Sequence, residues 1–213
     1  MKALGLLGGT FDPVHFGHLR LGIDALEELS LESIRWIPSG APGHRHSPVA
    51  SAAHRLEMLR LAIADEPRFH VDAAELESTE PTYTINTFKR LRGELGKEIS
   101  LVMLIGMDSL LTLHTWREWQ KLFDFAHFAV AERPGCTLNE AELDPNLKAL
   151  YQERHTDSTT LCKTPHGHVV RFNSVPVAVA ATDIRSRLAK NQSARYLIPA
   201  TVLRYIESHA LYR

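Results

Sequence analysis

Short apolar runs alternate with longer amphipathic stretches along the 213 residues of the chain. The predicted strands lie at 3–7, 33–37, 69–71, 98–105, 128–131 and 169–172. The predicted helices lie at 15–29, 51–65, 82–95, 182–188 and 199–207, with a variable helical segment at 138–155. The run at 98–105 is nearly continuous in apolar residues, so we expect a central strand that is buried on both faces. This alternation is typical of an α/β fold with a doubly wound, Rossmann-like parallel sheet.

The first strand leads directly into a glycine turn and a helix. Gly8, Gly9 and Thr10 break the apolar run, and Phe11-Asp12-Pro13 reads as a second turn, because proline disfavours helix at the residue before it. A strand, a glycine turn and a helix in this order direct backbone N–H groups and a helix N-terminus at a phosphate. This stretch therefore predicts a phosphate site.

Two histidines, His15 and His18, lie at the start of the helix that follows the turn. Imidazole titrates near neutrality, and a bound polyphosphate would favour its charged form. The pair could therefore stabilise charge that develops during phosphoryl or nucleotidyl transfer. We expect Gly17 between them to let a ligand approach the backbone. A metal pair is the alternative, but helical metal pairs are usually four residues apart and no nearby Cys or carboxylate completes a site, so we expect no protein-bound metal.

Composition narrows the class of protein. The formal net charge is −1, which argues against a broad nucleic-acid-binding surface. Cys136 and Cys162 supply neither a disulfide framework nor a metal motif. No apolar stretch is long enough for a secretory signal or a membrane span. We expect a cytoplasmic enzyme or binding protein built as one domain over 1–213, with a C-terminal helical portion at about 182–213.

Polar residues follow several of the predicted strands and open two helices. His44 and Arg45 stand in a loop rich in proline and glycine, which is either a solvated loop or one that grips an anion. Tyr83 and Thr84 open a helix, where a hydroxyl and the helix N-terminus suit a carboxylate, although a threonine there could simply be an N-cap. Asp108 could accept from a ribose hydroxyl or cap a helix.

The remaining candidates lie in the second half of the chain. Trp116 could stack on a flat ring or belong to the core, and Arg133 follows a strand as a candidate phosphate contact. Thr182 can cap a helix that carries Arg185 in its first turns, which makes a second phosphate site. His166-Gly167-His168 could be a metal pair, but its place in a loop favours no chemistry.

The stretch G-G-T-F-D-P-V-H-F-G-H resembles the opening of nucleotidyltransferases with an H-x-G-H signature, and its longer form is most similar to bacterial nicotinate-nucleotide adenylyltransferases. Four further segments resemble that family in the same order, so the resemblance spans residues 8–206. They are P-S-G-A-P-G-H-R, P-T-Y-T, the D-S-L to W-R-E-W segment with R-P-G after it, and A-A-T-D-I-R, and the Y-L-I-P tail at 196–199 extends the resemblance to residue 206. The chain departs from the family pattern at Gly43, where a proline is usual, and at Ala180, where a serine is usual.

The resemblance implies the reaction of ATP with nicotinate mononucleotide to give nicotinate adenine dinucleotide and pyrophosphate. It implies an ATP site at Gly8, Gly9, Thr10, Phe11, His15, His18, Thr182 and Arg185, with His15, His18 and Arg185 catalytic. It implies an acceptor site at His44, Arg45, Tyr83, Thr84, Asp108, Trp116 and Arg133. In the family the tryptophan stacks on nicotinate and Mg²⁺ rides on the ATP phosphates. A homodimer is left open, and no nucleic-acid or membrane partner is expected.

Three alternatives remain at this stage. The acceptor could be nicotinamide mononucleotide, which differs by a neutral amide in place of a carboxylate. It could be phosphopantetheine, although those enzymes are usually shorter and lack the paired tryptophans. The chain could also be a nucleotide sensor that kept the fold without the activity. His15, His18 and Arg185 argue against a sensor, and Ala180 argues for one.

Overall fold

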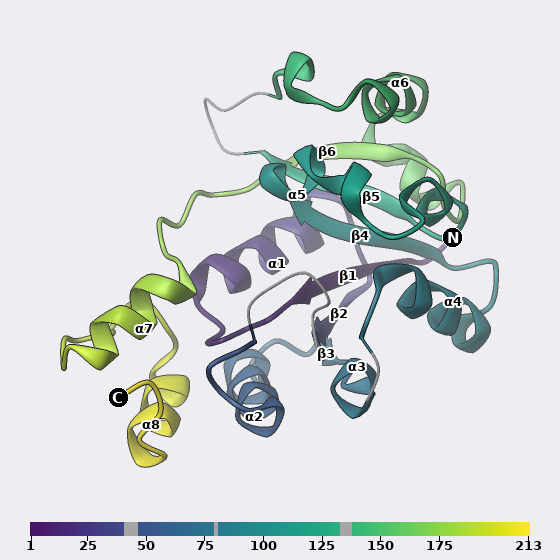
Figure 1. Cartoon of the computed structure of the whole chain (residues 1–213). Helices are drawn as coiled ribbons and strands as arrows, with labels where there is room; N and C mark the ends of the chain where they lie inside the picture. Colours follow the sequence, from purple (N-terminus) through teal and green to yellow (C-terminus); the bar gives the residue numbers. More distant parts are fainter. Residues whose placement is uncertain (41–46, 79–80, 133–137) are drawn as a thin grey trace.

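The computed structural model describes residues 1–40, 47–78, 81–132 and 138–213. Its centre is a six-stranded sheet with the order β3-β2-β1-β4-β5-β6, in which every neighbouring pair of strands is parallel (Figure 1). The strands are β1 (Ala3–Gly9), β2 (Ser33–Pro38), β3 (Phe69–Val71), β4 (Ser100–Gly106), β5 (His127–Glu132) and β6 (Val169–Asn173). All six predicted strands are therefore confirmed. The strand order reverses between β1 and β4, which is where doubly wound sheets bind ligands.

Helices follow the strands and cover both faces of the sheet (Figure 1). The α-helices are α1 (Phe16–Glu28), α2 (Ala52–Ile63), α3 (Ala74–Glu77), α4 (Thr84–Leu95), α5 (Met107–Leu111), α6 (Pro145–Arg154), α7 (Ala181–Ala189) and α8 (Ala200–Ser208). The described residues also form the 3₁₀ turns η1 (Leu113–Thr115), η2 (Trp119–Asp124), η3 (Glu140–Glu142) and η4 (Ser158–Cys162). The predicted helices agree with this, and Ser51 caps α2 by accepting from the His54 N–H.

The core is divided by the sheet, because alternate strand residues point to opposite faces. On one face Leu7 and Trp36 pack with residues of α1, α2, α7 and α8. On the other face Leu6 and Met103 pack with residues of α4, α5 and α6. The strand β4 is buried from Ser100 to Ile105, as its continuous apolar run predicts. The fold is thus the doubly wound parallel sheet that the sequence predicts.

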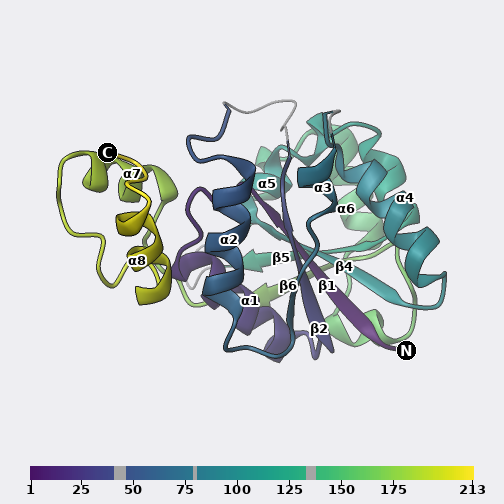
Figure 2. The same ribbon diagram turned by 90° about the horizontal axis from the view of Figure 1, so that it is seen from below.

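The C-terminal helices α7 and α8 lie beyond the carboxyl end of β1, beside α2 (Figure 2). The inner face of α8 is apolar, with Val202, Leu203 and Ile206 buried against the α1 and α2 side of the core. This arrangement places the start of α7 near the turn that follows β1. No helix among the described residues has the length and apolar character needed to span a bilayer.

Candidate functional site

The turn after β1 is a compact backbone feature. Phe11 has a left-handed φ of 50° and is only 2% exposed. The centroid of its ring lies 5.1 Å from that of the His18 ring. A Cβ at Gly9 would lie 2.9 Å from the Phe11 ring, so this position needs glycine. Because the Phe11 ring lies in the core, any contact between Phe11 and ATP would come from its backbone.

The two predicted histidines lie against each other at the start of α1. His15 is the N-cap, and its ring stacks on that of His18 with centroids 3.7 Å apart and an angle of 23° between the planes. The His15 backbone N–H donates to His18 Nδ1 at 3.3 Å. A neutral His18 therefore carries its proton on Nε2, which is available as a donor. His15 Nδ1 is buried with no hydrogen-bond partner among the described residues.

Burial lowers the pKa values of both histidines below the near-neutral value that the sequence predicts. It lowers the pKa of His15 from 6.5 to about 4. Burial, followed by the proximity of His15, lowers the pKa of His18 from 6.5 to about 3. Both rings are therefore neutral at pH 7 without ligand, rather than poised near neutrality. Each can still donate an N–H to an oxygen, and a bound anion would raise both pKa values.

Gly17 has a different role from the one that the sequence suggests. A Cβ at this position would lie 3.1 Å from the His15 ring and 3.2 Å from Val179 Cγ1. The space above Gly17 is therefore filled by protein rather than left for a ligand. Glycine here allows the His15 ring and the segment before α7 to pack closely against α1.

The turn also holds Arg185, which comes from α7. Its Nη1 donates to the carbonyl oxygen of Asp12 at 2.6 Å and lies 3.8 Å from the Asp12 carboxylate. The structure thus brings all three predicted catalytic residues to one turn. Thr182 is exposed in the first turn of α7, whereas the N-cap is Ala180 and has no side-chain cap. The expectation that Thr182 caps the helix is therefore wrong.

A cavity of about 440 Å³ lies next to this turn, between β1, β2, α4 and η1. Six of the predicted residues line it, from both substrate sets. They are Gly8, Gly9 and Thr10 on the turn, Tyr83 and Thr84 at the start of α4, and Trp116 after η1. Segments that are more than one hundred residues apart in the chain therefore meet in one site, at the point where the strand order reverses.

The start of α4 has the features of an anion site. Tyr83 is its N-cap, and no side chain among the described residues caps the helix. The alternative interpretation of a threonine as the N-cap is therefore wrong. The Arg117 guanidinium lies over the Tyr83 ring, 4.7 Å from the ring centroid, and Arg117 also lines the cavity. Helix N–H groups and a guanidinium both favour a negatively charged ligand group.

Two charged residues of this cavity are absent from the sequence prediction. Glu75 lies in an acidic stretch that reads as a solvated rim, yet it lines the cavity and accepts from the Thr87 hydroxyl at 2.6 Å. Arg117 lies between Trp116 and Trp119, and the sequence pattern assigns a role to Trp116 only. A signal for Glu75 was lacking, because its position depends on how α3 packs beside α4. Arg117 could have been found from its place next to Trp116.

Other predicted residues are placed differently or not described. Asp108 is exposed in the first turn of α5 and is not among the residues that line the cavity. It does not cap α5, whose N-cap is Gly106 without a side-chain cap. His44, Arg45 and Arg133 lie outside the described residues.

The described residues contain no group of three or more His, Cys, Asp or Glu side chains that could hold a metal ion. Mg²⁺ prefers oxygen ligands and usually keeps several waters, so phosphate groups of a nucleotide fit it better than this site does.

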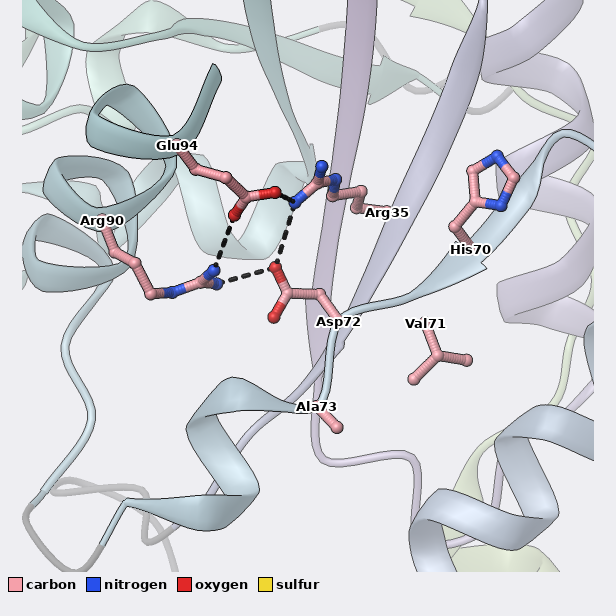
Figure 3. A pocket seen from close by; sticks show the side chains of 7 residues that line it. All are labelled: Arg35, His70, Val71, Asp72, Ala73, Arg90 and Glu94. Atoms are coloured by element: carbon pink, nitrogen blue, oxygen red, sulfur yellow. Dashed lines mark hydrogen bonds and ion pairs between the residues drawn. The ribbon is translucent and has the colours of Figure 1, made fainter. Parts of the chain in front are cut away.

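A second hollow of about 440 Å³ lies between β2, the end of β3 and the C-terminal part of α4 (Figure 3). Arg35 and Arg90 each pair with both Asp72 and Glu94, which closes a ring of four ion pairs (Figure 3). The charges here satisfy one another, in contrast to the cavity that Tyr83 and Trp116 line. This network joins α4 to β2 and β3, and so supports the helix whose opposite end opens the first cavity.

Comparisons with known proteins agree with this geometry. The sequence model of the family described as cytidylyltransferase-like matches residues 6–187. A protein of Dechloromonas aromatica (strain RCB), named as a probable nicotinate-nucleotide adenylyltransferase, is 47% identical over 100% of this chain and 98% of its own length. A protein of the same name from Aeromonas salmonicida (strain A449) is 46% identical over 99% of this chain and 97% of its own.

Solved structures show the same fold. A nicotinic acid mononucleotide adenylyltransferase of Plasmodium falciparum, complexed with NaAD, superposes with a TM-score of 0.72 at 20% identity, covering 100% of this chain and 98% of that one. The same enzyme complexed with APC superposes with a TM-score of 0.67.

Proposed function

The chain belongs to the nicotinate-nucleotide adenylyltransferases of the cytidylyltransferase-like family, and from this membership we infer the activity of its site. It is an adenylyltransferase that joins ATP and nicotinate mononucleotide to give nicotinate adenine dinucleotide and pyrophosphate, a step of NAD biosynthesis. The observation that carries this function to particular residues is the cavity in which the β1 turn meets Tyr83, Thr84 and Trp116.

Adenylyl transfer requires that the two reacting phosphates are aligned and that the developing charge is stabilised. An oxygen of the acceptor 5′-phosphate attacks the α-phosphorus of ATP, a new P–O bond forms, and the bond to the leaving pyrophosphate breaks. The attacking oxygen is already ionised at neutral pH, so the protein need not supply a general base or a covalent nucleophile. The protein then acts by holding the two phosphates in line and by stabilising the charge that moves to the leaving group.

The turn and the two histidines supply the donors on the ATP side. Backbone groups of Gly8, Gly9 and Thr10 face the triphosphate, and His18 Nε2–H and the His15 ring donate to its oxygens. Both rings are neutral before ATP binds, because burial lowers their pKa values to about 4 and about 3. ATP therefore meets hydrogen-bond donors that become charged only as the phosphates approach.

Arg185 and the start of α7 hold the leaving pyrophosphate. Arg185 is already fixed at the turn by its bond to the Asp12 carbonyl, so little side-chain freedom is lost when the phosphates bind. Thr182 lies exposed in the first turn of α7, within reach of the same phosphates. Mg²⁺ would come with ATP and would supply charge neutralisation at the phosphates, while Arg185 and the start of α7 hold the pyrophosphate.

The acceptor occupies the cavity. Its pyridine ring stacks on Trp116, and its carboxylate lies at the start of α4 by Tyr83 and Thr84, where the helix N–H groups and Arg117 favour an anion. Glu75 remains available to accept from ribose hydroxyls. Asp108 is proposed for the same task, and His44, Arg45 and Arg133 for the phosphate of the acceptor.

The test measures pyrophosphate release from ATP and Mg²⁺ with nicotinate mononucleotide, and then with nicotinamide mononucleotide. We expect a strong preference for the acid, because the neutral amide gains nothing from a positive helix end. Replacing Arg117 with glutamine should reduce that preference by raising KM for the acid form only. Equal rates with both acceptors in the unchanged protein would overturn the carboxylate site, and no release with either would overturn the function.

A further inference from the structure

Three long-range contacts converge on the turn between β1 and α1. Arg55 of α2, which is 2% exposed, donates to the carbonyl of Thr10 at 2.8 Å. Arg185 of α7 donates to the carbonyl of Asp12. Tyr212, which follows α8, donates its hydroxyl to Asp12 Oδ1 at 2.6 Å. The turn that faces ATP is therefore held from three separate elements, and two of the three contacts end on Asp12.

Asp12 is the centre of this arrangement. Its side chain is 4% exposed, and its carboxylate accepts from the N–H groups of Val49 at 2.8 Å and Ala50 at 3.1 Å as well as from Tyr212. A buried carboxylate needs such partners, because an unpaired one carries a large desolvation cost. Its negative charge also offsets the charge of Arg55, whose own pKa is lowered by burial.

Tyr212 is built for this contact. Its side chain is 8% exposed, and its hydroxyl also lies 4.0 Å from Met58 Sδ on α2. Burial and the hydrogen bond to Asp12 raise the pKa of Tyr212, so the hydroxyl stays a donor throughout the physiological pH range. The pair joins residues that are 200 positions apart.

We propose that Asp12 and Tyr212 form a positioning pair, through which the C-terminal segment fixes the ATP-binding turn relative to Arg185 and α7. The turn consists of non-helical backbone with a left-handed residue at Phe11, so its shape depends on such outside contacts. Neither residue lines the acceptor cavity itself, whereas Gly8, Gly9 and Thr10 of the same turn do, so we expect a large effect on ATP and a smaller one on the acceptor. This inference rests on the proposed function, since it assigns the turn to ATP.

The experiment compares two single hydroxyl deletions in the C-terminal segment. Tyr212→Phe removes the donor to Asp12 and keeps the ring. Tyr205→Phe is the matched control, because the Tyr205 hydroxyl bonds His54 Nδ1 of α2 at 3.0 Å and has no contact with the turn. Asp12→Asn, which keeps the shape of the side chain, is made alone and together with Tyr212→Phe. Calorimetry gives the Kd for ATP, and pyrophosphate release gives kcat and both KM values.

In Tyr212→Phe we expect the Kd for ATP to rise about tenfold and kcat to fall by about tenfold or more, because a misplaced turn loses alignment. The KM for nicotinate mononucleotide changes less than the Kd for ATP, and Tyr205→Phe leaves Kd and kcat unchanged. Asp12→Asn has an effect of the same direction, and adding Tyr212→Phe to it changes little more, because the two residues act as one unit.

A Kd and a kcat in Tyr212→Phe equal to those of Tyr205→Phe would overturn the positioning role and leave only packing. The positioning role would also be overturned if the protein without substitutions did not bind ATP. A protein that binds ATP but does not transfer the adenylyl group would contradict the proposed function alone, since the Kd comparison still decides whether the pair positions the turn.

Discussion

Two pairs of histidine rings stack among the described residues, and the two pairs differ in the hydrogen bonds of their ring nitrogens. His15 and His18 stack at the turn after β1, while His127 and His168 stack at the start of β5 with ring centroids 5.5 Å apart. Burial lowers the pKa of both His15 and His127 to about 4. By charge alone, these two buried histidines look alike.

Their hydrogen bonds separate them. His127 Nε2 bonds the carbonyl of Thr164 at 2.9 Å, and its Nδ1 accepts from the His168 N–H at 3.1 Å, so both ring nitrogens are paired with backbone. His15 Nδ1 is buried without a partner among the described residues. A buried polar atom without a partner costs stability, and His114 Nδ1 and Trp36 Nε1 are further examples among the described residues, so the location of the atom decides what it means. A lowered pKa alone therefore does not mark a site, and His15 differs from His127 because its unmet hydrogen bond lies at the turn beside the cavity.

The largest expected effect comes from the first pair. His18→Ala removes a donor directed at the triphosphate, and kcat should fall by about a hundredfold to a thousandfold. The far-UV circular dichroism should match that of the unchanged protein. The control is His168→Ala, which truncates the corresponding ring of the second pair and should leave kcat within about twofold. An unchanged rate in His18→Ala would contradict the assigned role.

The second pair should respond in stability instead. His127→Leu leaves the Thr164 carbonyl and the His168 N–H without their partner, at a cost of about 2–4 kcal/mol in the free energy of unfolding. Urea unfolding measures this loss, and kcat below the unfolding transition should stay close to that of the unchanged protein. A large loss of kcat in a folded His127→Leu protein would show that the two pairs are not distinct in role.

Burial of His127 should make the free energy of unfolding depend on pH. The pKa of His127 is about 4 in the folded protein against 6.5 in the unfolded chain, so the unfolded chain binds more protons. The contribution of His127 to the free energy of unfolding is complete above pH 6.5 and is lost as the pH falls from 6.5 to 4. It amounts to about 3 kcal/mol. His127→Gln should flatten this part of the stability curve.

ATP should change the titration of the first pair only. Imidazole NMR signals of His15, His18 and His127 should show neutral rings down to pH 6 in the unliganded protein. Bound ATP should move the signals of His15 and His18 toward the charged form and leave that of His127 unchanged. A titration of His15 near pH 6.5 without ATP would contradict the burial argument.

The sequence predicts much of this site because its signals are local. The apolar run, the glycine turn and the spacing of His15 and His18 define the first βα unit, and Tyr83 and Trp116 stand in segments with their own pattern. The contact between Asp12 and Tyr212 has no local signal, since a tyrosine near the end of a helical segment reads as ordinary packing. Arg55 likewise reads as one charge of an amphipathic helix, although it is buried.

The charge of the two histidines and the packing around Gly17 could not be predicted from the sequence either. The pKa values of the histidines depend on burial that only the fold supplies, so both rings are neutral where the sequence suggests titration near neutrality. The role of Gly17 depends on Val179, which reaches it from the far end of the chain. Such long-range neighbours decide which local interpretation of a residue holds.

The smallest effects come from the two glycines beside the pairs. In Gly17→Ala the new methyl group would lie 3.1 Å from the His15 ring, so the ring must shift by a few tenths of an ångström. We expect kcat to fall by about twofold to tenfold, because a donor moves out of line, while stability changes little. Gly167 has a φ of +104°, and a Cβ there would make only ordinary contacts, 3.7 Å from Phe123 O and 3.9 Å from Arg154 Nη1, so Gly167→Ala strains the backbone and should cost about 1 kcal/mol without changing kcat. Activity and urea unfolding on both variants test this. If Gly17→Ala lost only stability and Gly167→Ala lost activity, the assignment of one pair to catalysis and the other to the fold would be reversed.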